Sequence, residues 1–361
     1  MRFRLYPTLA QKVLLLEACG QARYVWNLGL EQRLMWRRDK GPTPGFNAQS
    51  AQLTEARKSE PWLAGGSHTV QQQALRDLDQ GWRNFFAGTH RRPTWRKVGQ
   101  HEGIRIVGPQ ALRVSLDRAG RWQIAFAVIP DPVPGPGTGQ VVGVDRGVMV
   151  AVALSTGAMS SPAGLALKEA ERLLRLQRRL ARAKRGSNRR VRVKTQIARV
   201  KAREGDRRKD WVEKTSTDLA RGFDVIRVEN LNVKAMTRSA RGTLEKPGRN
   251  VRAKAGLNRG ILKAGWSQLV TQLEDKAPGR VERVNPAYTS QTCNACKHIA
   301  AESRESQSRF RCVACGHQGN ADVNAACNIA AGHAVTGRGY LGVLARSVKR
   351  QPQTARPPKV A

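Results

Sequence analysis

Residues 288–330 of the chain read YTSQTCNACKHIAAESRESQSRFRCVACGHQGNADVNAACNIA and contain five of its six cysteines. Four of these cysteines form two Cys-x2-Cys pairs, Cys293 with Cys296 and Cys312 with Cys315, separated by fifteen residues. Each pair can bend into a knuckle that offers two thiolates, and an intervening hairpin can bring both knuckles around one tetrahedral metal ion. The spacing predicts one structural zinc ion, because four thiolates leave no open position for a reactive water.

Two details of this stretch leave alternatives open. Gly316 after the fourth cysteine, Cys315, fits a tight knuckle turn, whereas Lys297 and His298 follow the second cysteine, where a glycine is usual. His298 is interpreted as a solvent-exposed loop residue rather than a substitute ligand. The alternative to zinc is a pair of disulfides, which would require an oxidising compartment. No apolar run near the N-terminus has the form of an export signal, so we expect a reduced, cytosolic protein.

The chain is strongly basic. Its 361 residues include 64 Lys plus Arg and 27 Asp plus Glu, a formal net charge of +37. This excess indicates a polyanionic partner, and the abundance of arginine favours nucleic acid. A merely solvated basic surface is the alternative. No apolar run approaches the roughly 18 to 20 residues that a membrane span needs, so we expect no membrane partner.

The first 130 residues combine helical segments with short strands. Alternation over Met1–Tyr6 predicts a strand, and helical periodicity follows over Thr8–Arg37, Gln49–Glu60 and Val70–Phe86, with Thr8 and Thr69 as helix starts. Three later alternating runs predict a small antiparallel sheet or barrel, which the first strand can join across the helices. These runs are Gly103–Val107, Leu112–Leu116 and Trp122–Val128. The sequence PDPVPGPGTG at residues 130–139 then indicates a domain boundary.

Three acidic residues beyond this boundary are placed selectively. Asp145 ends an apolar strand in Gln140–Leu154, Glu229 ends another in Asp224–Leu231, and Asp322 opens a late helix whose alanines would let it lie close to a sheet. For Asp145 alone, a turn-forming aspartate is the alternative. Carboxylate oxygens are the ligands that Mg²⁺ prefers, and two Mg²⁺ ions about 3.5 to 4 Å apart can promote phosphodiester hydrolysis. The three acids therefore predict a two-metal nuclease site.

Between the first two acids, Leu167–Asp218 has a helical pattern interrupted at Gly186–Asn188, which predicts a helical hairpin. Basic residues coat it, and this charge imbalance favours a surface that follows phosphates over a solvated coiled coil. The predicted nucleic-acid-binding residues are Arg172, Arg175, Arg178, Arg179, Arg182, Lys184, Arg185, Arg189 and Arg190. Further along, Lys234–Asn258 is expected to be a basic loop, Ile261–Leu273 a helix and Gly279–Asn285 a strand.

Several motifs together resemble one protein family. GVDRG around Asp145, VENLNV around Glu229, TSQTCNAC with CVACG, and ADVNAACNI around Asp322 resemble the TnpB (OrfB) proteins encoded by bacterial transposons, which are related to type V CRISPR effector nucleases. The segments LYPTLAQ, ARYVWN, PWL and QQQALRDLDQGWRNFF extend the resemblance over about residues 2–332. The combination is specific, although no single motif is.

The resemblance implies an α+β multidomain fold. An N-terminal wedge-like β-barrel would be interrupted by a helical recognition domain, and a linker would lead to an RNase H-like RuvC α/β nuclease domain with an inserted four-cysteine zinc ribbon. The implied boundaries are 1–7 and 91–131 for the barrel, 8–90 for the recognition domain, 132–139 for the linker, 140–287 and 318–335 for the RuvC domain, 288–317 for the zinc ribbon, and 336–361 for a basic disordered tail.

The resemblance also implies an activity. A guide RNA from the transposon end would pair with target double-stranded DNA beside a short flanking motif, and the RuvC site would cut the DNA. Asp145, Glu229 and Asp322 match the catalytic Mg²⁺ ligands of the family, and the four cysteines match its zinc ligands. We expect one Zn²⁺, two Mg²⁺ and one guide RNA on a monomer in the bacterial cytosol, associated with the nucleoid when bound to DNA.

Other functions are weighed against this one. A nuclease-silent RNA-guided repressor would lack one of the three acids, and all three are present. A transposase would need a nucleophilic tyrosine with paired histidines, or its own acid triad with strand-transfer machinery; the six histidines include no His-x-His pair. A zinc-ribbon RNA-binding module, or an accessory DNA-binding protein of a transposon, leaves the acids at the strand ends unexplained.

Overall fold

The computed structural model describes residues 2–37, 39, 41–100, 102–107, 111–128 and 130–332. The predicted tail, residues 336–361, lies outside the described residues. The chain divides into two compact units. Unit 1 comprises Met1–Pro130 with Leu165–Asp206, and unit 2 comprises Asp131–Gly164 with Arg207–Ala361.

The helices at the start of unit 1 follow the predicted periodicity closely. They are α1 (Leu9–Met35), α2 (Phe46–Ser59), α3 (Pro61–Ala64) and α4 (His68–Phe86). Thr8 caps α1, since its hydroxyl accepts from the N–H of Gln11 while the Gln11 side chain accepts from the N–H of Thr8. The predicted start of α4 at Thr69 was wrong: Ser67 is the N-cap, because its hydroxyl accepts from the N–H of Val70.

The sheet of unit 1 has four antiparallel strands in the order β1-β4-β3-β2. The strands are β1 (Arg2–Leu5), β2 (Gly103–Ile106), β3 (Leu112–Leu116) and β4 (Trp122–Phe126). The prediction that the N-terminal strand joins this sheet across the helices is confirmed, because Arg2 pairs with Ala125 and Leu5 with Trp122. Buried Ile104, Val114 and Trp122 pack with apolar residues of α1 to α4 in one core.

The predicted helical hairpin is also present. Helix α5 (Leu167–Arg182) and the long helix α6 (Asn188–Gly222) are separated by a turn in which Gly186 has a φ of 86°. Leu173 and Leu176 of α5 pack against Val193 and Val200 of α6. The hairpin is therefore held by a narrow apolar stripe, which leaves the other faces of both helices available for charge.

The sheet of unit 2 has five strands in the order β7-β6-β5-β8-β9. They are β5 (Val141–Asp145), β6 (Val152–Leu154), β7 (Met159–Ser160), β8 (Val225–Glu229) and β9 (Val281–Val284). Strands β5, β8 and β9 run parallel, whereas β6 and β7 are antiparallel additions. The carboxyl ends of β5 and β8, where Asp145 and Glu229 lie, therefore meet at one edge of the sheet.

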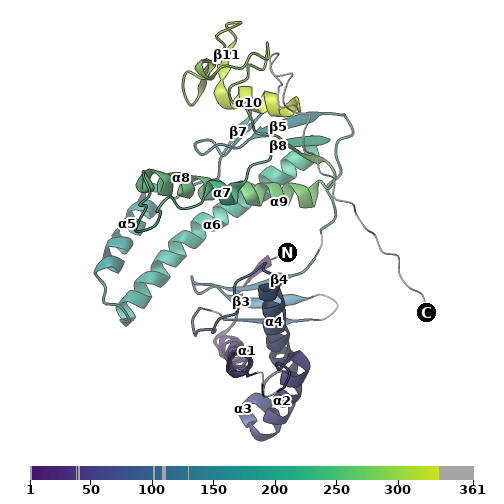
Figure 1. Cartoon of the computed structure of the whole chain (residues 1–361), viewed down its shortest axis with the longest axis vertical. Helices are drawn as coiled ribbons and strands as arrows, with labels where there is room; N and C mark the ends of the chain where they lie inside the picture. Colours follow the sequence, from purple (N-terminus) through teal and green to yellow (C-terminus); the bar gives the residue numbers. More distant parts are fainter. Residues whose placement is uncertain are drawn as a thin grey trace, which may run out of the picture. The chain divides into compact units, whose positions relative to one another are not determined.

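Helices cover both faces of this sheet (Figure 1). On one face, Val142, Val144, Ile226 and Val228 pack against α6 and against α9 (Trp266–Lys276). On the other face lies α10 (Ala321–Ala330). Its backbone comes so close to β5 that a Cβ at Gly143 would lie 2.0 Å from the carbonyl oxygen of Ala326. The small residues of α10 permit this approach.

The prediction of a basic loop over Lys234–Asn258 was wrong in part. Short helix α7 (Val233–Met236) overlaps its start, and α8 (Val251–Ala264) begins within it. Asn250 is the N-cap residue of α8, but it adopts the left-handed conformation and its side chain makes no capping hydrogen bond. Among the helices of the described ranges, none has the length and apolar character needed to cross a membrane.

Candidate metal centres

The three predicted acids lie around the junction of the unit 2 sheet and α10. Side chains alternate along a strand, so Asp145 points to the same face as Gly143, toward α10. Glu229 shares a face with Arg227, whose guanidinium donates to the carbonyl oxygen of Ala330 in α10. Asp322 is in the first turn of α10 itself. The structure thus brings together two strand ends and one helix start that are far apart in sequence.

The electrostatics of the acids show their proximity. Burial, followed by the charges of Glu229 and Asp322, raises the pKa of Asp145 from 3.8 to about 7, and the charge of Arg304 opposes this rise. Burial also raises the pKa of Glu229, while the hydrogen bond from Thr289 and the charge of Arg146 oppose it. Carboxylates that repel one another in a partly buried site are stabilised by a bound cation. The donor set and its electrostatics therefore fit Mg²⁺.

Neighbouring side chains fix the orientation of two of these acids. The hydroxyl of Thr289 donates to Oε1 of Glu229 at 2.8 Å. The guanidinium of Arg304 lies 3.0 Å from Oδ1 of Asp322 and also donates to the carbonyl oxygen of Gln307. Sequence analysis missed Arg304, because nothing local distinguishes it among the 64 basic residues. The hydroxyl of Thr289 was also missed, although it lies next to the cysteine pattern.

Asp322 is placed by the start of α10. The side chain of Asn320 caps the helix and accepts hydrogen bonds from the N–H groups of Asp322 and Val323. A carboxylate in the first helical turn interacts favourably with the positive end of the helix dipole. The cap thus holds the backbone of Asp322 at the end of the helix that faces the other acids.

The four predicted zinc ligands form one compact cluster. All four sulfur atoms lie within 4.8 Å of one another; Cys293 and Cys315 are 3.8 Å apart, and Cys296 and Cys312 are 3.5 Å apart. Four thiolates at about 2.3 Å from a tetrahedral zinc ion would be about 3.8 Å apart. The sulfurs are not joined in disulfides. The cluster fits zinc, whereas the three carboxylates of the other site do not meet this 4.8 Å spacing.

The chemistry of the cluster also suits a metal. Burial favours the neutral thiol of Cys312, but the N–H groups of Cys315 and Ala314 and the neighbouring Cys296 lower its pKa from 9.0 to about 6. N–H groups directed at a sulfur stabilise the thiolate, which is the form that binds zinc. The N–H group of His317 lowers the pKa of Cys315, but hydrogen bonds with the neighbouring sulfurs raise it to about 12, so the cluster favours one thiolate among thiols.

The two knuckles have matching backbones despite their different residues. Lys297 adopts the left-handed conformation with a φ of 62°, and Gly316 adopts it in the second knuckle with a φ of 73°. Lys297 in place of glycine therefore raises the conformational free energy of the first turn but does not change its shape. His298 is exposed, and its carbonyl accepts from the N–H of Cys293. Its interpretation as a loop residue is consistent with this contact.

Asparagine side chains join the cysteine cluster to α10. Asn324 donates to the carbonyl oxygen of Thr292 and accepts from the N–H of Asn294, inside the first Cys-x2-Cys pair. Asn328 donates to the carbonyl oxygens of Thr289 and Thr292. Both asparagines are buried. The cluster and Asp322 are therefore parts of one hydrogen-bonded structure, in which folding of the cysteine cluster also positions an acid.

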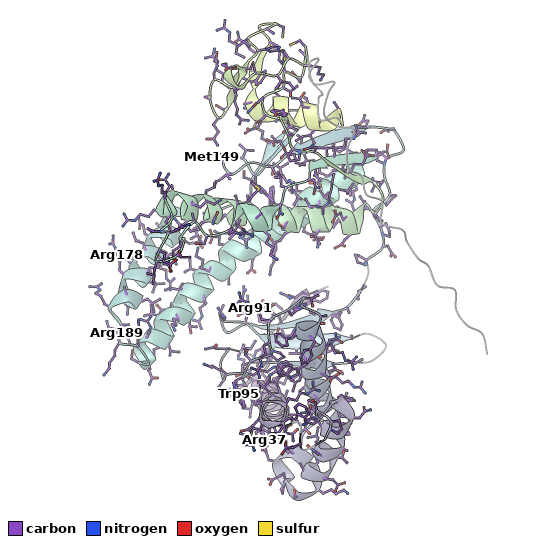
Figure 2. All side chains as sticks on the ribbon, in the orientation of Figure 1. Arg37, Arg91, Trp95, Met149, Arg178 and Arg189 are labelled. Atoms are coloured by element: carbon purple, nitrogen blue, oxygen red, sulfur yellow. The ribbon has the colours of Figure 1, made fainter. Side chains whose placement is uncertain are left out.

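The predicted basic residues of the hairpin lie on its surface. Eight of the nine are exposed, and Figure 2 labels Arg178 and Arg189 among them. A hollow of about 520 Å³ near the tip is lined by Arg179, Arg182, Ala183, Lys184, Ser187 and Arg189. Arg190 differs, because it donates to the carbonyl oxygens of Leu180 and Ala183 at the end of α5. That contact gives it a role in capping the helix.

Comparisons with known proteins place this mixed α/β chain with its four-cysteine cluster in a family. The OrfB model described as a probable transposase matches residues 123–240. The OrfB helix-turn-helix domain matches residues 1–41, and the Cas12f1-like TNB domain matches residues 266–329. The chain belongs to the TnpB (OrfB) family, which is related to the Cas12f nucleases.

Relatives align over nearly the whole chain. The putative RNA-guided DNA endonuclease InsQ of Escherichia coli (strain K12) is 33% identical over 97% of this chain and 96% of its own length. A putative RNA-guided DNA endonuclease of Streptomyces pristinaespiralis is 31% identical over 98% of this chain and 96% of its own length. A solved Cas12f1–sgRNA–target DNA complex aligns with 91% of this chain and 98% of its own at 15% identity, but its TM-score of 0.30 is too low to establish a shared arrangement.

Proposed function

We propose that the protein is an RNA-guided DNA endonuclease that hydrolyses phosphodiester bonds at a Mg²⁺-dependent site of the RuvC type. The observation that carries this proposal is the convergence of Asp145, Glu229 and Asp322 where the parallel strands β5 and β8 meet α10, with the pKa of Asp145 raised to about 7. The names of the two full-length relatives support guide RNA and target DNA as its partners.

In this proposal the three acids are the metal ligands. Mg²⁺ bound there would supply neutralisation of phosphate charge and activation of a water molecule. Thr289 orients Glu229 through its hydrogen bond, and Arg304 holds Asp322 through its ion pair. The Nη2 atom of Arg304 already donates to Asp322 and to the carbonyl oxygen of Gln307, so its Nε and Nη1 groups would be the donors to a phosphate oxygen that approaches Asp322.

The zinc ion would have a structural role. It would close the module of β10 (Arg309–Arg311) and β11 (Gln318–Asn320), from which α10 continues directly. We infer that the sheet of unit 1 is the wedge, that α1 to α4 form the recognition domain, and that unit 2 contains the RuvC domain. The exposed basic residues of the hairpin would follow the phosphates of the guide RNA or its duplex with DNA.

A nuclease-silent repressor is the second candidate. It would bind guide RNA and target DNA without cutting. The three acids would then have no catalytic function to offset the cost of burying them. Their burial is costly, as the raised pKa of Asp145 shows. This cost favours the nuclease.

The test uses the full chain expressed with its flanking DNA. The protein and its RNA are incubated with a plasmid library that carries a guide-matched target beside randomised flanks, in Mg²⁺ or in EDTA. We expect cutting in Mg²⁺ only, from plasmids that share one flanking motif, and none with Asp145→Ala. Asp218→Asn is the matched control, because Asp218 is an exposed acid on α6. Target binding without cutting by the wild type would favour the repressor instead.

A further inference from the structure

One face of unit 1 carries aromatic rings and guanidinium groups in alternation. The segment Arg91–Val98 (RRPTWRKV) follows α4 and lies against α1 and α4. The indole of Trp26 in α1 donates to the carbonyl oxygen of Thr94, and Asn27 exchanges two hydrogen bonds with the backbone of Arg96. The segment is thus fixed to the helices, and its side chains have defined positions.

Arginine side chains of this segment are stacked on tryptophan rings of α1 and α4. The guanidinium of Arg96 lies 3.7 Å from the ring centroid of Trp26, and that of Arg92 lies 5.4 Å from the ring centroid of Trp82. Trp82 is in turn stacked on Phe86, with 5.7 Å between centroids and 25° between ring planes. We call Trp26, Trp82, Phe86, Arg92, Trp95 and Arg96 the aromatic–arginine face.

The outer members of this face are open to solvent. Phe86 is 77% exposed and Trp95 is 44% exposed. Figure 2 shows Arg91 and Trp95 at the same edge of unit 1. Large rings left in water on a fixed surface indicate a binding site, because their burial stabilises whatever covers them.

The charge around these rings is mainly positive, and Asp77, the acid that acts on Arg96, is paired with Arg105. The sequence has no Asp or Glu between Asp79 and Glu102, while the same interval has five Arg or Lys residues. Asp79 is paired with Arg33 and Arg83, and Glu102 is paired with Arg23. A ligand of this face must therefore offer negative charge together with flat apolar rings, and a nucleic acid offers both.

We propose that the aromatic–arginine face binds unpaired nucleotides of the guide RNA, with bases stacked on Phe86 and Trp95 and phosphates against Arg91 and Arg92. The proposal rests on the proposed function for the identity of this RNA. Bases within a duplex are already stacked on one another, so only unpaired ones can cover an aromatic side chain. A protein partner would bury the rings but would leave the positive charge uncompensated.

The experiment measures the affinity of the full chain, freed of its RNA at high salt, for a fluorescent 12-nucleotide oligo(U) RNA by anisotropy. Base stacking on aromatic side chains predicts a loss of roughly 5- to 100-fold for Phe86→Ala or Trp95→Ala. Trp95→Phe should stay near wild type, because the ring is retained. Trp62→Ala is the matched control, since Trp62 is 46% exposed on α3 and follows Glu60 and Pro61 instead of arginines.

Two further probes separate stacking from charge and RNA from DNA. An abasic RNA of equal length should bind wild type and Trp95→Ala equally, and the salt dependence of oligo(U) binding should be the same for both. A 12-nucleotide oligo(dT) DNA is the third probe. The proposal would be overturned if Trp95→Ala lost as much affinity for the abasic RNA as for oligo(U), if it lost no affinity for oligo(U), or if it lost affinity only for oligo(dT). None of these outcomes changes the Asp145-dependent cleavage assay, so the proposed function is tested separately.

Discussion

The substitution Asp145→Asn should stabilise the metal-free protein. The folded protein keeps a proton on Asp145 up to a pKa of about 7, whereas the unfolded chain releases it near 3.8. The folded state therefore binds more protons between these values, and its free energy of unfolding falls as the pH rises through this window. Asparagine has no charge to bury, so the variant escapes this cost.

The size of the effect follows from the same two values. If the whole difference between a folded pKa of about 7 and an unfolded pKa of 3.8 is realised, ionisation of Asp145 lowers the free energy of unfolding by about 4 kcal/mol at pH 8. Asp145 is only partly buried, so solvent screening reduces this figure, and we expect about 2 to 4 kcal/mol. For a unit of this size the gain is an increase of roughly 5 to 10 °C in Tm.

The assay is thermal unfolding followed by circular dichroism in EDTA. Asp145→Asn should melt above wild type at pH 8 and together with it at pH 4. Saturating Mg²⁺ should then raise the Tm of wild type at pH 8 and have little effect on the variant, because the variant has lost an anionic ligand. Asp218→Asn should match wild type throughout. A variant that melts at or below wild type at pH 8 in EDTA would refute the electrostatic argument.

Three other predictions concern the packing, the cysteine cluster and the hairpin. Gly143→Ala should destabilise the protein by about 3 kcal/mol in denaturant unfolding, because its Cβ would lie 2.0 Å from a backbone oxygen of α10, whereas Gly222→Ala, with nothing within 4 Å, should not. The wild type should contain about one zinc per chain by elemental analysis and Cys312→Ser much less; equal zinc in both would exclude the cluster as the site. Replacing Arg179 and Arg182 with Gln should reduce the slope of log affinity for single-stranded RNA against log salt by about 1.4; an unchanged slope would mean that they contact no phosphate.

The features predicted well from sequence are those set by local patterns. The spacing of the four cysteines was sufficient to predict the cysteine cluster, because each knuckle is a turn of a few residues. Asp145 and Glu229 could be identified because each is a charge that ends an apolar strand, and Thr8 because a capping box lies within four residues. The strand pairing of Arg2 with Ala125 was predicted only as a possible closure across the helices.

The features that were missed depend on distant contacts. Arg304 reaches Asp322 only because the cysteine module folds back on α10. Helix α8 begins at Val251 without a side-chain cap, and its buried residues Ile261 and Ala264 pack with Ala151, which is far away in sequence. The sequence around Gly143 does not distinguish it from an ordinary strand residue, and the need for glycine there comes from its close contact with α10. No period in the sequence indicates that Trp26 and Arg96 stack.

A guide-exchange experiment measures whether the guide RNA determines which DNA is cut. The RNA that copurifies with the protein is sequenced, its guide segment is exchanged for one that matches a second plasmid, and the reassembled complex is given both plasmids in Mg²⁺. We predict that cutting moves to the second plasmid and that Asp145→Ala cuts neither. Cutting that does not follow the exchanged guide, or that persists in Asp145→Ala, would show that this chain is not an RNA-guided nuclease with its active site at Asp145, Glu229 and Asp322.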